Sequence, residues 1–490
     1  MKKLSGEKDR IKFVLISPDY KLYGDPPLGL AALASYLRRE CNFLDINIFD
    51  QIKEEKMLKI LANKKPEVIG ISAVSQNYHK ALRLAKIIKK ISPSSILMIG
   101  GVHITTLPES FKNSPFDIGV RGEGETPAKK FFDLFYEERK INIKKLSKIP
   151  GFLIRDKDKI MDTGLSEEVS NLDDLPLPAR GMLNMSYYKL PRFSSKEIDA
   201  KGAILTSRGC PFACRFCASS SFWRRRIRFF SAERVIQELK ILYYKYKYDT
   251  IEIYDDLFSI NKERLRKIVK MLKDSGLMGK VKFLVMARAN SFDEETATLF
   301  EQMGVSSLAF GFETGSQKVL NYLKADNVSI ENGINAIKIA RRHRLPIYGF
   351  FMAGAPTEAV EDMEMTYNFI KDNRLESGQI LQVTAYPGTE CWTYAIKNGI
   401  IKKDFYDKKR KDFSDINPDL LLSREISKKD FIYHFYRIKR LITPNKKKIE
   451  SILFRVSSLR ARHLKLVLSR EFLEKANSLK KNFIRDVIIR

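Results

Sequence analysis

The sequence predicts an α/β protein in three parts: an amino-terminal domain with a doubly wound parallel sheet, a partial (βα)6 barrel of the TIM type, and a basic helical carboxyl-terminal region. Short apolar runs alternate with helical stretches twice, over residues 11–135 and again from residue 203. Continuous apolar strands separated by helices are typical of parallel sheets covered on both faces. After about residue 400, the sequence has a helical pattern and its basic residues outnumber its acidic ones.

The strands of the first domain are expected at five runs rich in β-branched residues: 11–17, 46–50, 68–72, 96–101 and 117–122. Helices are expected between them, for example at 28–39 and 79–91, where apolar residues recur at helical spacing. A doubly wound domain binds ligands outside the carboxyl ends of its strands. The candidate ligand-binding residues in those loops are Ser72, Gly100, Gly101, His103 and Glu123.

The alternation of strand-like and helical stretches stops over residues 146–200, which include the proline-rich stretch 171–180. We expect a linker there. The expected division is therefore a first domain at 1–145, a linker at 146–200, a barrel at 201–400 and a basic helical region at 401–490.

The barrel is expected to contain six strands, at 203–210, 250–256, 282–289, 307–314, 346–354 and 379–388. Six βα units fall short of the eight of a full barrel. Each strand finishes with polar residues, glycine or proline at its carboxyl end, where barrel enzymes carry their active sites. A single polar residue at such a place is ordinary loop capping, but six in register indicate a site. The candidates among them are Asp255, Asp256, Arg288, Glu313 and Gly354.

Three cysteines follow the first barrel strand in the stretch SRGCPFACRFCASS, at Cys210, Cys214 and Cys217. Three thiolates on one tight loop can bind three irons of a [4Fe-4S] cluster. The remaining cysteines, Cys41 and Cys391, lie far away in sequence, so the fourth iron is left open for a small molecule. A structural zinc site would need four ligands, usually in cysteine pairs, and the sequence has no second pair.

This loop resembles the signature of the radical S-adenosylmethionine superfamily. In that family the open iron binds the amino and carboxylate groups of S-adenosylmethionine, and one electron cleaves the sulfonium to give methionine and a 5′-deoxyadenosyl radical. The resemblance implies that Phe216 contacts adenine, that Asp255 or Asp256 and Arg288 meet the methionyl end, and that Glu313 lies near the ribose. Gly354 begins GAPTEA, where the family usually has G-x-P-G-E-T, so the second glycine is missing.

The first domain resembles the cobalamin-binding domain that precedes the barrel in one large subfamily. The resemblance rests on PPLGLAALASYLRR, GISAVSQNYHKA, IGGVHITTLPE and RGEGE. Cobalamin domains of the mutase type carry D-x-H-x-x-G in the first loop, whereas this chain has Asp19-x-Lys21-x-x-Gly24. A protonated lysine has no lone pair for cobalt. We therefore expect cobalamin without a histidine ligand, and His103 as a wall residue; the alternative is a degenerate domain that binds no ligand.

These resemblances together imply an enzyme that uses a [4Fe-4S] cluster, S-adenosylmethionine and cobalamin to methylate an unactivated carbon. The alternatives are a cobalamin-independent radical cyclase, oxidase or rearrangement enzyme, and a non-catalytic iron–sulfur module. A methylthiotransferase would need a second cysteine triplet, and Cys41 is the only cysteine before Cys210. The expected partners are a small-molecule or lipid-like substrate and an electron donor such as flavodoxin or ferredoxin, with no specific nucleic acid.

The net charge of +29 is unevenly spread, because residues 421–490 hold 19 Lys+Arg and 6 Asp+Glu. The stretch 449–468 has helical periodicity with apolar residues on one face, so it is expected either to lie on an anionic membrane or to pack on the barrel. The charge could equally be solvated surface. No apolar run is long enough to span a bilayer, and the start lacks a signal-peptide core. We expect a cytoplasmic protein with peripheral membrane contact through the basic tail.

Overall fold

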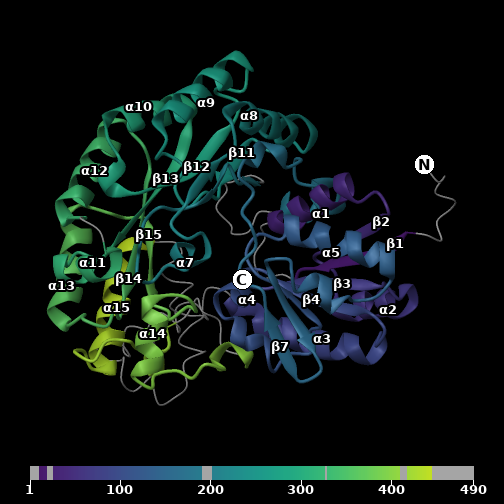
Figure 1. Ribbon diagram of the computed structural model, residues 1–490. Helices are drawn as coiled ribbons and strands as arrows, with labels where there is room; N and C mark the ends of the chain where they lie inside the picture. The colour runs from purple at the N-terminus through teal and green to yellow at the C-terminus, as the bar shows by residue number, and fades with distance from the viewer. Residues whose placement is uncertain (1–9, 19–25, 190–200, 326–327, 409–415, 444–490) are drawn as a thin grey trace, which may run out of the picture.

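The computed structural model describes residues 10–18, 26–189, 201–325, 328–408 and 416–443. Two sheets dominate it, one in the purple and blue half of Figure 1 and one in the teal and green half. The basic stretch 449–468 and Lys21 both lie outside the described residues.

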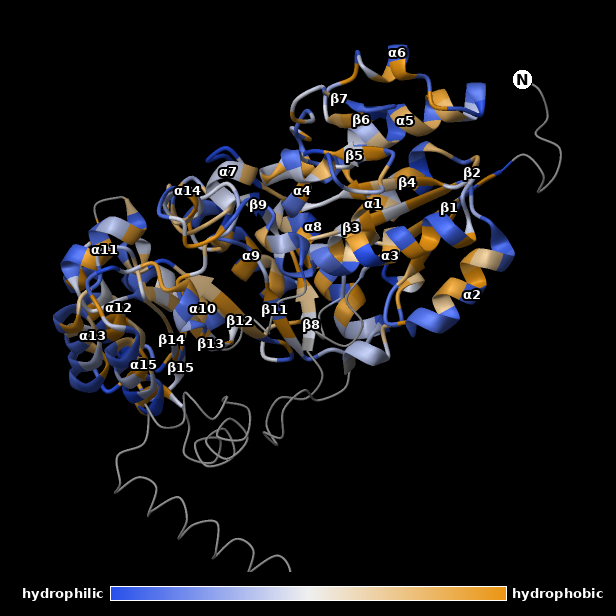
Figure 2. Cartoon of the chain, turned by 90° about the horizontal axis from the view of Figure 1, so that it is seen from below, coloured by the Kyte–Doolittle hydropathy of each residue, from blue (hydrophilic) through white to orange (hydrophobic). Residues whose placement is uncertain are grey.

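The first sheet has the order β2-β1-β3-β4-β5-β6-β7. Its first five strands are parallel, as expected for a doubly wound domain: β1 Ile11–Ile16, β2 Leu44–Phe49, β3 Val68–Ser72, β4 Ile96–Gly100 and β5 Ile118–Val120. The helices that cover it are α1 Leu28–Glu40, α2 Glu54–Lys64, α3 Tyr78–Ile91, α4 Val102–Thr106 and α5 Glu125–Glu138. Figure 2 shows β1 and β4 coloured as hydrophobic, with mixed helices around them. One core cluster packs this sheet against α1 and α5, and a second packs it against α2 and α3.

Two strands of this sheet were not predicted. β6 Phe152–Asp156 pairs antiparallel with β5, and β7 Lys159–Asp162 pairs antiparallel with β6. Both lie in residues 146–200, which we interpreted as a linker. The two strands extend the edge of the first sheet. The chain reverses tightly between them at Lys157, which has a left-handed backbone.

The second sheet has six parallel strands in sequential order and confirms the partial barrel. The strands are β8 Lys201–Ile204, β11 Thr250–Ile253, β12 Lys282–Ala287, β13 Val305–Glu313, β14 Ile347–Ala353 and β15 Gly378–Gln382. The helices around it are α8 Ala232–Lys240, α9 Lys262–Asp274, α10 Glu294–Met303, α11 Gln317–Lys324, α12 Ile330–Arg342 and α13 Val360–Asp372. Side-chain caps at Ser231, Asn261 and Asp293 fix the first turns of α8, α9 and α10. This regularity brings the strand ends to one rim.

The first predicted barrel strand is divided in the structure. β8 ends at Ile204, and the chain then forms β9 Ser207–Gly209, which pairs antiparallel with β10 Ile227–Phe229. The short helix α7 Ser219–Phe222 lies between β9 and β10. The cysteine loop is thus placed by a small ribbon beside the barrel rim.

After β15 come α14 Glu390–Lys397 and α15 Lys428–Ile442. α15 packs against α13 through a buried face that includes Phe431, Phe435 and Ile438. Within the described part of the chain, no helix has the length and hydropathy needed to cross a bilayer.

Candidate active site

The cysteine loop leaves β9 through Gly209, whose backbone is left-handed with φ +99°. A Cβ at this position would lie 2.0 Å from the carbonyl oxygen of Arg226, so only glycine permits this close approach. Cys210, Cys214 and Cys217 follow, all partly exposed. Burial raises the pKa of the Cys210 thiol to about 11, and the nearby Asp256, Cys214 and Cys217 add to that rise. The three thiols therefore share one electrostatic environment.

The three thiols fit a cluster with one open iron. Each thiolate binds its own iron in such a cluster, so the sulfurs need not converge on a point. Among the described residues, no three His, Cys, Asp or Glu side chains are grouped closely enough to bind a single metal ion, as a zinc site would require. Cys391 is far from the cysteine loop in sequence but contacts it in the fold. Its backbone N–H donates to the carbonyl oxygen of Arg215 at 3.3 Å. Its side chain is fully buried in a hydrophobic cluster against which Phe216 packs.

The two aspartates after β11 have different environments. Asp255 is buried, and its carboxylate accepts hydrogen bonds from the Thr206 N–H at 2.5 Å, the Thr206 hydroxyl and the Ser207 N–H at 3.1 Å. It therefore fixes the turn from β8 to β9 and does not face the cavity. Asp256 lines the cavity and accepts a hydrogen bond from the Ser219 hydroxyl at 2.9 Å. Asp256 is an exposed residue, yet desolvation by the surrounding protein raises the pKa of its carboxyl.

Arg288, after β12, lies beside the cysteine loop. Its Nη1 is 3.4 Å from the Cys214 sulfur, and its guanidinium carbon is 3.7 Å from the centroid of the Phe212 ring. Arg288 is thus where the sequence placed it, near the cluster ligands.

Glu313 ends β13 in a left-handed conformation with φ 66°, which is uncommon for a residue with a side chain. Its buried carboxylate pairs with Lys324 Nζ at 2.5 Å. The same ammonium lies 6.0 Å from the centroid of the Phe216 ring. Lys324, which the sequence analysis missed, therefore links Glu313 to Phe216. The strained backbone at Glu313 persists because the surrounding structure fixes it at the barrel rim.

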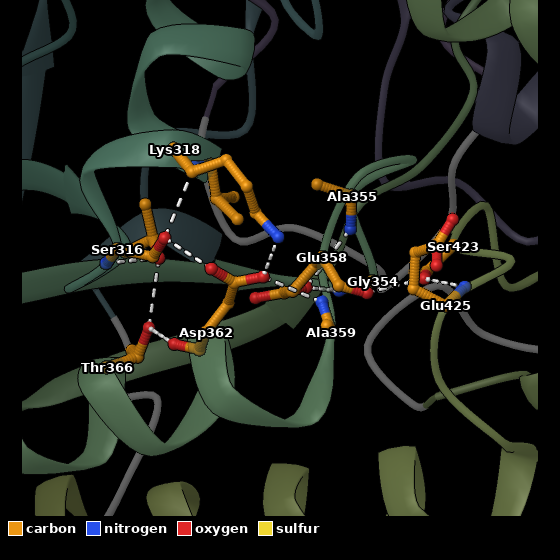
Figure 3. A network of polar contacts seen from close by, with 12 residues as sticks. Ser316, Lys318, Gly354, Ala355, Glu358, Ala359, Asp362, Thr366, Ser423 and Glu425 are labelled. Atoms are coloured by element: carbon orange, nitrogen blue, oxygen red, sulfur yellow. Dashed lines mark hydrogen bonds and ion pairs between the residues drawn. The ribbon is translucent and has the colours of Figure 1, made fainter.

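Gly354, after β14, also has a left-handed backbone, with φ +87°. A Cβ there would approach a Leu421 methyl to 2.7 Å, so the glycine makes room for the carboxyl-terminal segment. Glu358 closes this loop by accepting hydrogen bonds from the N–H groups of Gly354 and Ala355 (Figure 3). Burial raises the pKa of Glu358 to about 7.

A cavity of about 380 Å³ lies between the two domains. From the first domain it takes the ends of β3 and β4 at Ser72, Gly100 and Gly101, and from the barrel side it takes Gly209 and Asp256. It continues as an apolar slot between the first sheet and helices α1 and α5, lined by Phe13, Leu15, Leu28, Met98, Val120 and Phe132. One cavity thus extends from the loops of the first domain to Gly209, where the cysteine loop begins.

The first-domain wall of the cavity fits a large flat ligand such as cobalamin. Gly101 has φ +99°, and a Cβ there would lie 2.6 Å from the Ala73 carbonyl oxygen. A Cβ at Gly29 would meet no atom within 4 Å, so this turn of α1 leaves space beside the slot. The apolar slot suits an aromatic base, since burial of apolar surface favours binding.

His103 does not line the cavity. It is fully buried, its Nδ1 is 2.9 Å from the Ser75 hydroxyl, and its ring stacks on Tyr78 with centroids 3.9 Å apart. Burial lowers the pKa of His103 to about 3, so its imidazole is neutral. In this position it packs behind the loop.

Glu123, which we expected at a cobalamin, lines the cavity but is already paired. Its carboxylate is 3.0 Å from Arg208 and 2.6 Å from Arg228, and the Val169 N–H donates to it at 2.7 Å. Burial alone would raise the pKa of Glu123, but the hydrogen bond from Arg228 and the charge of Arg208 bring it below its ordinary value. It serves as an ionised anchor between the domains.

Two family models match the chain. The radical SAM superfamily matches residues 204–370, and the B12 binding domain matches residues 21–132. The matched ranges contain the three cysteines and the glycine loops of the cavity, respectively.

Curated relatives match across most of the chain. An uncharacterized methyltransferase of Pyrococcus horikoshii is 34% identical over 85% of this chain and 89% of its own length. The cytidylyl-2-hydroxyethylphosphonate methyltransferase of Streptomyces wedmorensis is 26% identical over 80% of this chain and 82% of its own. Among solved structures, the radical S-adenosylmethionine methyltransferase TsrM of Kitasatospora setae, with cobalamin and a [4Fe-4S] cluster bound, superposes with a TM-score of 0.65 at 16% identity. It covers 80% of this chain and 75% of its own. At that identity the likeness establishes the fold.

Proposed function

Because this chain belongs to the radical S-adenosylmethionine superfamily and carries a B12-binding domain, we propose that it is a cobalamin-dependent methyltransferase acting on an unactivated carbon of a small apolar molecule. One observation carries the proposal: a single cavity is bounded by the glycine loops of the first domain and by Gly209, the residue that directly precedes Cys210. A carrier of methyl groups and a site of radical formation must share one space for such a reaction. Both curated relatives are named as methyltransferases, which supports methyl transfer.

The residues that would bind each group follow from the geometry. Cys210, Cys214 and Cys217 would bind the cluster, and Asp256 and Arg288 offer opposite charges beside it for the amino and carboxylate groups of S-adenosylmethionine. Cobalamin would lie at the loops that contain Ser72, Gly100 and Gly101. When bound, the cluster and S-adenosylmethionine supply radical formation, and cobalamin supplies a transferable methyl group.

The roles of the surrounding residues are to position and to exclude water. Asp255 fixes the turn that precedes the cysteine loop, through its bonds to Thr206 and Ser207. The Glu313–Lys324 pair keeps a buried charge neutralised at the rim, beside Phe216. Such a preorganised polar rim needs no rearrangement when a charged ligand arrives.

An apolar substrate is supported by the inward face of the barrel. Glu252 pairs with Ala203 of β8 and with Leu284 of β12. The same registers, continued by two residues, would bring Leu205, Tyr254 and Met286 into one row. Leu205 is 37% exposed and Met286 is 42% exposed, which is unusual for side chains on strands of a barrel interior. Leu205 and Tyr254 also line the cavity. This row would give a lipid-like or aromatic molecule an apolar floor below the level of Asp256.

Two partners complete the proposal. Radical formation needs one electron, so a flavodoxin or ferredoxin is the proposed donor. The basic region 421–490 is proposed to contact anionic membrane, where each basic residue near the surface contributes about 1 kcal/mol. Such contact would bring the enzyme to its substrate, because an apolar substrate would reside in the bilayer.

The test is anaerobic reconstitution with iron, sulfide and hydroxocobalamin, followed by reaction with methyl-labelled S-adenosylmethionine and a lipid extract. The proposal requires iron and cobalt in the same chain, release of S-adenosylhomocysteine and label in an apolar product. Release of 5′-deoxyadenosine with no S-adenosylhomocysteine and no cobalt would instead favour the cobalamin-independent radical enzymes.

A further inference from the structure

One wing of the cavity lies between α1 of the first domain and α8 of the barrel. Gly29 and Leu33 of α1 line it on one side, Arg234 and Glu238 of α8 on the other, and Pro176 closes it. The helices are close here, because Ala31 of α1 belongs to the same core cluster as residues of α8. This wing adjoins the apolar slot that Phe13 and Phe132 line.

Arg234 is the residue of this wing whose charge has no hydrogen-bonding partner among the described residues. Its Nε is buried without an acceptor, and the structure gives its guanidinium no hydrogen bond within the described ranges. The guanidinium carbon lies 5.4 Å from the centroid of the Phe230 ring, which holds it in place. Burial lowers the pKa of Arg234, yet arginine keeps its proton in proteins.

The carboxylates near Arg234 are already in use. Glu238 pairs with the buried Arg180 at 2.5 Å. Asp173 accepts a hydrogen bond from the Ser231 N–H at 3.0 Å. Of the nearby charges, Arg39 is itself paired with Glu40 at 2.8 Å. The Asp173 carboxylate offsets part of the charge of Arg234, but the Nε–H of this half-buried guanidinium has no acceptor among the described residues. Such a donor can bind an anionic ligand group.

We propose that Arg234 binds the phosphodiester of the nucleotide loop of cobalamin. The amide side chains of the corrin ring are neutral, and the phosphodiester is the anionic group of the molecule. It connects the corrin ring to the base, so it must lie between the surface that binds the ring and the surface that binds the base. The glycine loops suit the ring and the apolar slot suits the base, and Arg234 lines the same cavity. Arg234 is thereby a specificity residue for complete cobalamin, an inference that rests on the proposed function.

The experiment compares three corrinoids on anaerobically purified protein: hydroxocobalamin, cobinamide phosphate, which keeps the phosphate without the base, and cobinamide, which lacks both. Equilibrium dialysis with cobalt analysis gives the dissociation constants for the wild type, Arg234→Gln, Arg234→Lys and the control Arg226→Gln. Arg226 is an exposed residue whose side chain pairs with Glu168 outside the cavity. Arg234→Gln is expected to weaken hydroxocobalamin and cobinamide phosphate by about tenfold to a hundredfold and to leave cobinamide unchanged, since charged hydrogen bonds contribute that much.

Arg234→Lys should recover part of the affinity, because it keeps the charge and loses the fork. Arg226→Gln should bind all three corrinoids as the wild type does. Equal weakening of all three corrinoids by Arg234→Gln, or no weakening of any, overturns the assignment of Arg234 to the phosphate. A wild type that binds none of the three instead refutes the proposed function, so the two failures can be told apart.

Discussion

Arg208 donates a hydrogen bond to Glu125 at 2.6 Å, and this contact crosses from the strand before the cysteine loop to the first helix turn after β5. Both side chains are largely buried. Arg208 is two residues before Cys210, and Glu125 is two residues after Glu123 in the loop that lines the cavity. The pair thus ties the strand before the cysteine loop to the first-domain loop that lines the cavity.

Replacing Arg208 with Ala should destabilise the chain, because it leaves Glu123 and Glu125 buried with one cation fewer. Removing one partner of a buried ion pair costs about 3–5 kcal/mol. Urea unfolding of the apoprotein measures this loss, with the exposed Arg226→Ala as the control. A loss equal to that of the control would mean that the interdomain pair contributes nothing.

Iron content tests the three predicted ligands. Anaerobic reconstitution should give about four irons per chain, and Cys210→Ala, Cys214→Ala or Cys217→Ala should each lose most of it. Cys391→Ala is the matched control, since Cys391 contacts the same loop through its backbone while its thiol is fully buried in a hydrophobic cluster. If Cys391→Ala lost iron as the others do, a fourth protein ligand would exist and the open iron would be wrong.

Binding of S-adenosylmethionine separates the two aspartates. Asp256→Asn should weaken binding about tenfold or more with little change in melting temperature, because Asp256 faces the cavity. Asp255→Asn should lower the unfolding free energy by about 1–3 kcal/mol, because an amide cannot accept all three hydrogen bonds from Thr206 and Ser207. Calorimetric titration and thermal unfolding of both variants give the answer, and the reverse pattern would exchange their roles.

The pH dependence of the unfolding free energy should reveal the raised pKa of Glu358. Burial raises its pKa from 4.5 to about 7 in the folded chain. The folded state therefore holds this proton more tightly than the unfolded state does. The resulting stabilisation is complete below about pH 4.5 and is lost as the pH rises through about 7.

Glu358→Gln removes this titration and keeps an oxygen that can accept from Gly354 and Ala355. The variant should therefore gain stability relative to the wild type between pH 5 and pH 8, as measured by urea unfolding of the apoprotein. A pH-independent difference between the two proteins would show that Glu358 titrates normally.

The cysteine spacing and the polar strand ends could be predicted because both are local in sequence. The two aspartates show a signal that was available and unused: Ile251 and Ile253 face the buried side of β11, and a period of two puts Asp255 on that side and Asp256 on the other. The hairpin β6–β7 had alternating residues around a charged turn, so its strands were also within reach.

Long-range pairings could not be predicted in this way. No local pattern places Arg208 beside Glu125, or Lys324 beside Glu313, because only the packed fold brings those residues together. The same holds for Gly354, whose missing side chain makes room for Leu421, far along the chain.

The central claim is that the cavity between the domains holds cobalamin beside the cluster. Gly29 tests it most directly, because Gly29 lines the cavity and a Cβ built on it meets no other atom within 4 Å. Cobalt and iron per chain are to be measured for Gly29→Phe and the small control Gly29→Ala after anaerobic reconstitution with hydroxocobalamin. The account predicts that Gly29→Phe keeps its iron and loses its cobalt, while Gly29→Ala keeps both. Stoichiometric cobalt in Gly29→Phe would contradict it.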